Sequence, residues 1–409
     1  MNQLKIIEIL HRHPLLFKIL LSAFLPLKID RRFKYNKHLT LASINLYTDT
    51  LDSNKSSVWQ SILFPTEIFH SMNISPFVIE MTSSILAKMN LSNRLISLME
   101  CAGLTRELCS FHKCAAGAVR SGLIPVPEMI VTSSEVCDSI RKIGEFYSKI
   151  SGTSHFYLDV PFTKTEESLL YVKEQLSELI KWLEVNSGKK FSEEKFSESI
   201  KYSNSLRKNM MEVMELRREY PGIMGYKPVF GLFNFSLFYG SSEGVRISEI
   251  LLRELKEKAR SWRPSKDLVK ILWLHFTPFY KEEFTEVLEK NGRVSVVFEE
   301  MNNIYWKEVS EENPLESMAE RIFLSPFCGS VQNRLEKILS LCDFYDVAGV
   351  IHFSHLSCRK CNGGLRVIKD VLKEKNILFL DLSGDCIDSR NYSEGQLKTR
   401  LEAFLELFE

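Results

Sequence analysis

Short apolar runs alternate with amphipathic stretches through the last third of the chain. The runs are rich in Val, Ile, Leu and Phe, and they read VKILWLH (269–275), VSVVFEE (294–300), GVIHFS (349–354) and ILFLDL (377–382). Between and after them, the spacing of apolar residues predicts helices near 281–290, 331–342, 364–375 and from about Ser393. Apolar strands that alternate with helices are typical of a parallel, doubly wound sheet.

The first 160 residues show a similar but weaker rhythm. The candidate strands are short and β-rich, and they are LASINLY (41–47), PFVIEM (76–81), EMIVTS (128–133) and HFYLDVP (155–161). We therefore expect two related α/β lobes, one at each end of the chain.

Residues 162–262 carry a different pattern, with apolar residues every three or four positions, which predicts long amphipathic helices. Thr163 and Glu166 predict a capping box for the first helix, and Ser192 predicts the cap of the second. The predicted fold class is thus α/β, with two doubly wound parallel-sheet lobes and a helical connecting segment. The predicted boundaries are 1–40 for an N-terminal helical extension, 41–161 for the first lobe, 162–264 for the helical segment and 265–409 for the second lobe.

Composition and charge argue against several classes of function. The formal net charge is +1, which gives no support for a nucleic-acid-binding surface. The apolar stretch at 15–27 is shorter than the roughly 20 residues that cross a bilayer, so we expect no membrane span. It fits an amphipathic helix on the protein body, with a membrane-surface or partner helix as the alternative. The nine cysteines are an odd number behind a polar start, which favours reduced thiols in the cytoplasm over a secreted disulfide framework.

Three cysteines stand where a parallel sheet binds ligands. Cys137 and Cys358 each follow a predicted strand by a few residues, and Cys109 lies where a loop enters a helix. Three thiolates suit an iron–sulfur cluster with one iron left open, although the spacing matches no compact ferredoxin run. Buried, incidental thiols are the alternative. Zinc is another, since Cys358 and Cys361 form half of a zinc knuckle close to two histidines, His352 and His355.

Four ordered segments together resemble the D-component family of the 2-hydroxyacyl-CoA dehydratases, which also includes benzoyl-CoA reductase subunits and double-cubane cluster proteins. The segments cover residues 64–80, 107–138, 270–303 and 349–406, the last closing with DSRNYSEGQLKTRLEAF. The resemblance spans roughly residues 40–409. It implies that Cys109, Cys137 and Cys358 hold a [4Fe-4S] cluster. Cys114 and Cys361 are thiols beyond this pattern, and Glu299, Met301 and Asn302 stand where double-cubane members carry further cysteines, which favours one simple cluster.

The resemblance also implies a chemistry and partners. A separate ATP-dependent iron–sulfur activator protein would deliver one low-potential electron, so that a ketyl radical of the acyl-CoA substrate expels hydroxide. Glu67, in Pro65-Thr66-Glu67, is the candidate acid/base, with a helix N-terminal carboxylate as its alternative role. We expect an anaerobic lyase that pairs with a related second dehydratase subunit or with itself. A benzoyl-CoA reductase-type subunit, a double-cubane reductase and a non-catalytic cluster-carrying accessory protein remain alternatives.

Overall fold

The computed structural model describes residues 18–19, 22–23, 32–52, 54–226, 229–280, 287–288 and 292–408. The N-terminal helix expected at 15–27 and the helix expected near 281–290 lie largely outside these residues. The predicted boundary at residue 40 falls inside a described helix, α3 (Lys34–Asp49).

The first lobe is built on a parallel four-stranded sheet with the order β2-β1-β3-β4. Its strands are β1 (Ser57–Gln60), β2 (Ser75–Val78), β3 (Met129–Ser133) and β4 (Ser154–Leu158). Three of them match predicted strands. The sequence analysis missed β1, because this strand has only four residues and polar side chains at both ends, although all four are buried.

One predicted strand of this lobe is wrong. Residues 41–47 belong to α3, whose buried residues include Tyr35, Leu39 and Ala42. That spacing of four and three places the apolar side chains on one face of a helix, and a strand would require alternation. The other helices of the lobe are α4 (Glu67–Ser71), α5 (Ile79–Lys88), α6 (Ser92–Cys101), α7 (Ser110–Arg120) and α8 (Ile140–Ser151).

The second lobe repeats the strand order of the first. Its parallel sheet runs β6-β5-β7-β8, so the second strand in sequence again lies at the edge. The strands are β5 (Val269–Leu274), β6 (Val294–Glu299), β7 (Gly349–His355) and β8 (Leu378–Gly384), and the described helices are α14 (Pro314–Phe323), α15 (Val331–Tyr345), α16 (Arg359–Asn362), α17 (Leu365–Glu374) and α18 (Glu394–Glu406). Two parallel sheets with flanking helices confirm the predicted fold class.

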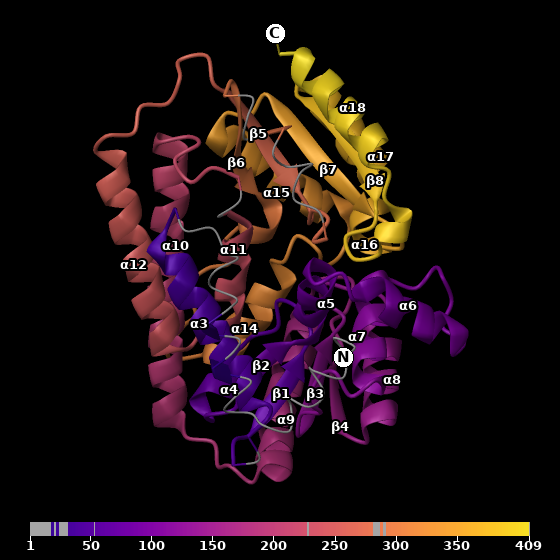
Figure 1. Ribbon diagram of the computed structural model, residues 1–409. Helices are drawn as coiled ribbons and strands as arrows, with labels where there is room; N and C mark the ends of the chain where they lie inside the picture. The colour runs from indigo at the N-terminus through magenta and orange to yellow at the C-terminus, as the bar shows by residue number, and fades with distance from the viewer. Residues whose placement is uncertain are drawn as a thin grey trace.

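Between the lobes the chain forms the predicted helical segment, which comprises α9 (Glu166–Ser187), α10 (Glu193–Glu219), α11 (Val229–Leu232) and α12 (Ser242–Ala259). Figure 1 shows α10 and α12 side by side along one flank of the molecule, and they pack on each other. Ser192 caps α10 as predicted, by accepting from the backbone N–H of Lys195. The capping box of α9 uses Thr165 and Ser168, so the predicted pair is wrong by two residues.

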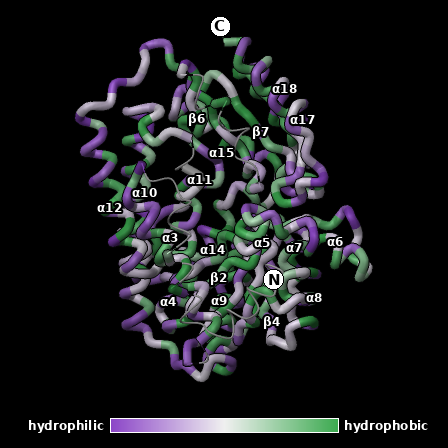
Figure 2. Tube along the Cα trace, in the orientation of Figure 1, coloured by the Kyte–Doolittle hydropathy of each residue, from purple (hydrophilic) through white to green (hydrophobic). Residues whose placement is uncertain are grey.

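The two lobes share a hydrophobic core. One cluster of buried side chains includes Trp59 and Ile130 of the first sheet together with Trp273 and Ile351 of the second. Figure 2 shows hydrophobic residues concentrated around the strands, while much of α10 and α12 is hydrophilic. In the described part of the chain, no helix combines the length and the apolar character that a membrane span requires. The shared core fixes the position of one lobe against the other, which matters for a site between them.

Candidate functional site

The three predicted cysteines lie at the ends of structural elements that face the junction of the two lobes. Cys109 is the N-cap of α7, and Cys137 lies in the loop between β3 and α8. Cys358 follows β7 and caps the short helix α16. All three are partly exposed and none forms a disulfide. Cys137 and Cys358 therefore stand beyond the carboxyl ends of central strands, where open α/β sheets bind ligands.

The three thiols are close enough to affect one another electrostatically. Burial raises the pKa of Cys109 well above its usual range, and the charges of Cys137 and Cys358 raise it further. Burial likewise raises the pKa of Cys137 to about 12, with a further contribution from Cys358. The N-terminus of a helix ordinarily favours a thiolate, and Cys109 stands at the N-terminus of α7. In the structure, burial and the neighbouring thiols outweigh the backbone hydrogen bond from Phe111.

Two buried histidines contact these thiols. His355 Nε2 lies 3.3 Å from Cys109 Sγ, and His112 Nε2 lies 3.4 Å from Cys137 Sγ. Burial lowers the pKa of both rings, that of His112 to about 4, so both are neutral near pH 7. His355 comes from β7 of the second lobe, whereas Cys109 belongs to the first. The contact therefore joins the two lobes at the site.

This arrangement fits a metal cluster. The thiolates of Cys109 and Cys137 are poorly stabilised by their surroundings, which raise the pKa of both, and a cationic cluster would offset their charges. Cys114 and Cys386 differ from the three predicted ligands in exposure, because both are fully buried in the hydrophobic core whereas the three ligands are partly exposed.

A second group of buried polar side chains lies at the carboxyl ends of β1 and β2. Gln60, Glu80 and Thr82 are at most 7% exposed, and their side chains form no hydrogen bond of good geometry with the described residues, although the backbone N–H of Ile62 is near Glu80. Burial raises the pKa of Glu80 to about 7. Buried polar groups without partners are rare and mark places where water or a ligand is expected.

Glu80 also interacts with the cysteine site, because its charge acts to raise the pKa of Cys137. The sequence analysis passed over this residue. The available signal was a carboxylate two residues after the strand that ends at Val78, on the ligand-binding edge of a parallel sheet.

Glu67 has a different environment from the one we expected of an acid/base. Its fully buried carboxylate forms a two-pronged ion pair with Arg321, at 2.5 and 2.8 Å, and accepts a hydrogen bond from Ser203 Oγ at 2.6 Å. Burial acts to raise the pKa of Glu67, but Arg321 and Ser203 hold it below its usual range. The carboxylate stands in the first turn of α4, which was the alternative role. Its catalytic role remains a prediction.

A small cavity lies beside this ion pair. It has a volume of about 40 Å³, and its lining includes Glu67, Arg321, Glu135 and two aromatic side chains, Tyr239 and Tyr305. Burial raises the pKa of Glu135 to about 8. The cavity is large enough for a few water molecules and far too small for an acyl-CoA.

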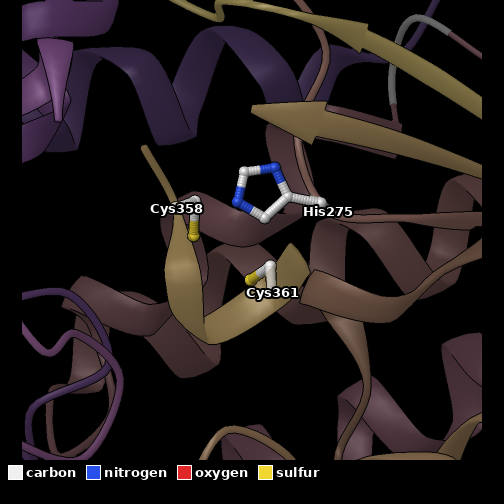
Figure 3. Close-up of side chains that lie close together, drawn as sticks. All are labelled: His275, Cys358 and Cys361. Atoms are coloured by element: carbon white, nitrogen blue, oxygen red, sulfur yellow. The ribbon is translucent and has the colours of Figure 1, made fainter. Parts of the chain in front are cut away.

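The histidine that meets Cys358 and Cys361 is not one of the two predicted from the zinc-knuckle pattern. His275, which directly follows β5, lies close to both thiols, with all three ligand atoms within 4.8 Å of one another (Figure 3). His355 contacts Cys109 instead, and His352 pairs with Asp381. Sequence spacing missed His275 because it is distant in the chain and adjacent only through the pairing of β5 with β7.

Comparison with known proteins places this architecture in a family. The family described as "2-hydroxyglutaryl-CoA dehydratase, D-component" matches residues 61–408. The (R)-phenyllactyl-CoA dehydratase alpha subunit of Clostridium sporogenes is 23% identical over 91% of this chain and 94% of its own length. The (R)-2-hydroxyisocaproyl-CoA dehydratase alpha subunit of Clostridioides difficile is 23% identical over 86% and 90%, and a benzoyl-CoA reductase subunit of Thauera aromatica is 22% identical over 77% and 80%. These matches confirm the prediction of a dehydratase-type enzyme subunit. The chain belongs to the 2-hydroxyglutaryl-CoA dehydratase, D-component family.

Proposed function

We propose that this chain is the iron–sulfur subunit of a 2-hydroxyacyl-CoA dehydratase and acts as the alpha-type partner of a related second subunit. The family match over residues 61–408 supports the reaction class. The observation that supports the proposal is the proximity of the three thiols, since the charges of Cys137 and Cys358 act to raise the pKa of Cys109 and the charge of Cys358 acts to raise that of Cys137. A self-dimer is the alternative assembly.

In this proposal the three cysteines hold a [4Fe-4S] cluster by three of its irons. When bound, the cluster would supply a low-potential electron to the substrate thioester, after receiving it from an ATP-dependent iron–sulfur activator protein. The chain's own contribution is to position the ligands and to keep the site dry. His112 and His355 fix the orientation of two thiols, and both rings stay neutral because they are buried.

Glu80 is the best-placed group for proton transfer. Elimination of water needs one proton for the departing hydroxide and releases one proton from the β-carbon of the acyl chain. A single carboxyl group that gives its proton to the hydroxide and then accepts the β-proton returns to its starting state, so the protons balance. Glu80 suits this because its pKa of about 7 lets it hold or release a proton near neutral pH, and because its oxygens have no other good partner among the described residues.

The test begins with protein purified without oxygen. We expect about four iron and four sulfide per chain, and loss of both in each of Cys109→Ser, Cys137→Ser and Cys358→Ser. Cys386→Ser and Cys114→Ser are matched controls, because they also alter buried thiols near the site yet should keep the iron. Iron that survives all three ligand substitutions would refute the cluster assignment. Roughly eight iron per chain would favour the double-cubane alternative.

Activity separates the remaining candidates. The loaded chain, combined with its second subunit and activator, should convert a 2-hydroxyacyl-CoA ester to the enoyl-CoA, detected by mass spectrometry. The similarity to a benzoyl-CoA reductase subunit supports one second candidate, which would reduce benzoyl-CoA and leave 2-hydroxyacyl esters unchanged. A chain that holds iron but acts on neither ester would instead be a cluster-carrying accessory protein.

A further inference from the structure

A second set of ligand atoms lies on one side of Cys358. Cys358 is the N-cap of α16, and Cys361 lies three residues later within this helix. His275 directly follows β5, and the ligand atoms of the three residues lie within 4.8 Å of one another. Figure 3 shows one ring nitrogen of His275 turned toward Cys358, with the Cys361 thiol below the ring. His275 and Cys361 are buried, and Cys358 is partly exposed.

The separation of these atoms suits one metal ion. A tetrahedral zinc ion binds sulfur at about 2.3 Å and imidazole nitrogen at about 2.0–2.1 Å, so its ligand atoms stand roughly 3.5–4 Å apart. A set within 4.8 Å needs only a small contraction to reach that geometry. Three protein ligands would leave the fourth position open to water.

The backbone beside these three ligands is strained, and such strain is typical of functional sites. His275 and Ser357, the residue before Cys358, both have left-handed backbone conformations, with φ of +67° and +69°. Such conformations cost about 1 kcal/mol or more in residues other than glycine and tend to occur at functional sites. His275 Nδ1 is also buried without a hydrogen-bond partner among the described residues, so hydrogen bonding at that nitrogen does not explain the ring's orientation.

One buried ion pair anchors both sides of the set. Arg334 Nε and Nη2 donate to the Glu300 carboxylate at 2.6 and 2.8 Å. The same arginine donates from Nη1 to the Cys361 carbonyl at 2.5 Å, while the same carboxylate accepts from the His275 backbone N–H at 3.3 Å. The pair therefore fixes the backbone of His275 relative to the backbone of Cys361. Residues around the ligands of a metal site position those ligands in the same way.

Charge favours a divalent ion in this place. Two thiolates, one neutral imidazole and one divalent cation sum to zero, and the anchoring ion pair is itself neutral. A buried site that is neutral overall avoids the large cost of an unpaired charge in the protein interior. Sulfur and imidazole ligands select thiophilic ions such as zinc over magnesium or calcium.

We propose that the cluster-free chain binds one thiophilic divalent cation of the zinc type through His275, Cys358 and Cys361. Cys358 is also a ligand in the proposed cluster, so the ion and the cluster exclude each other; this second part rests on the proposed function. The cation-bound chain is then a state that precedes cluster insertion. In this state the cation coordinates the thiolates of Cys358 and Cys361 and keeps them from reacting.

Cobalt(II) is a suitable probe, because it binds tetrahedral thiolate sites and is coloured there. The full chain, prepared reduced and free of iron, should bind about one Co²⁺ with a thiolate-to-cobalt charge-transfer band, and Zn²⁺ should displace it. Cys361→Ser and His275→Asn should each abolish the band or weaken binding at least about tenfold. Asparagine tolerates the left-handed backbone at position 275, which makes it the gentler substitution.

Controls separate this site from the cluster. Cys109→Ser should keep the cobalt band while it loses the capacity for a cluster, and Cys386→Ser should keep both. Circular dichroism and thermal unfolding show whether each variant is folded. A cobalt band unchanged in folded Cys361→Ser and His275→Asn, or lost in Cys109→Ser, overturns the proposed site.

Competition tests the shared ligand. Wild-type chain loaded with Zn²⁺ should take up no cluster on anaerobic reconstitution, and Cys361→Ser should take it up in the presence of the same Zn²⁺. Full cluster uptake with zinc retained would refute exclusion. If no variant accepts a cluster while the cobalt results hold, the proposed function fails and the cation site stands.

Discussion

The ion pair between Glu67 and Arg321 should be a main determinant of stability where α14 meets the first lobe. The Glu67 carboxylate is 0% exposed and the Arg321 side chain is 10% exposed. Arg321→Met keeps much of the side-chain volume but leaves a buried carboxylate without its partner. Removing one member of a buried pair typically costs about 3–5 kcal/mol, and we expect a loss of about that size in the free energy of unfolding at pH 7.

The loss should depend on pH, and its sign follows from the pKa of Glu67. In the native protein this pKa is lowered, so the pair contributes stability above the unfolded value of about 4.3 and loses it as pH falls through the folded pKa. In Arg321→Met only the weaker hydrogen bond from Ser203 opposes burial, so the pKa of Glu67 rises. The variant should therefore be clearly destabilised already at pH 5, and the destabilisation should grow toward pH 7.5, because the unpaired carboxyl group stays protonated in the folded state while it is ionised in the unfolded state.

Urea unfolding followed by circular dichroism at both pH values measures this difference. Glu67→Gln/Arg321→Met is the matched control, because it removes both charges and should recover much of the loss in a double-mutant cycle. A cost below about 1 kcal/mol for Arg321→Met, or a cost independent of pH, would contradict the reasoning. Glu67→Gln that is stable yet inactive would instead support the predicted acid/base role.

Three further predictions concern the site and its supports. Glu80→Gln should lower the dehydration rate about 10²–10⁴-fold and remove a fall in rate as pH rises through about 7, measured by rate–pH profiles. Because burial raises the pKa of Glu80 from 4.5 to about 7, the same variant should be more stable at pH 8 by on the order of 3 kcal/mol and unchanged near pH 4, as checked by urea unfolding. Gly117→Ala should destabilise the protein by about 1–3 kcal/mol, since an added Cβ would lie 2.5 Å from the Leu95 carbonyl oxygen. An added Cβ at Gly395 meets no atom within 4 Å, so Gly395→Ala should stabilise the protein slightly, and thermal unfolding of the two variants tests the difference.

The sequence pattern correctly predicted those strands and helices whose hydrophobic residues match their burial in the fold. The strands β5, β6, β7 and β8 are continuous apolar runs in a covered parallel sheet, so their sequences alone indicate their structure. The segment at 41–47 misled because its apolar residues cluster locally, and only the burial of Tyr35, Leu39 and Ala42 reveals the helical spacing. Strand β1 is too short and too polar at its ends to stand out.

The candidate site divides in the same way. Cys137 and Cys358 could be placed from the sequence, because the strands before them are clear and ligands bind beyond strand ends. The partners His275, His355 and Glu80 could not, since their roles depend on which strands are neighbours in the sheets and on burial. The ion pair of Glu67 with Arg321 joins residues 254 positions apart, which no local pattern encodes.

The position of the thiols at the lobe junction has a consequence for how the protein would fail. Ser110 of α7 donates to Asp385 at 2.6 Å, and Ser92 of α6 donates to the Ile387 carbonyl at 2.8 Å, so the first lobe is tied to the second beside Cys109. Any bound metal that draws ligands from both lobes crosslinks the lobes at this point. Loss of the metal would therefore weaken the contact between the lobes as well as empty the cofactor site. Proteolysis and amide exchange at the loops that carry Cys137 and Cys358 should therefore accelerate together when the protein is stripped of metal.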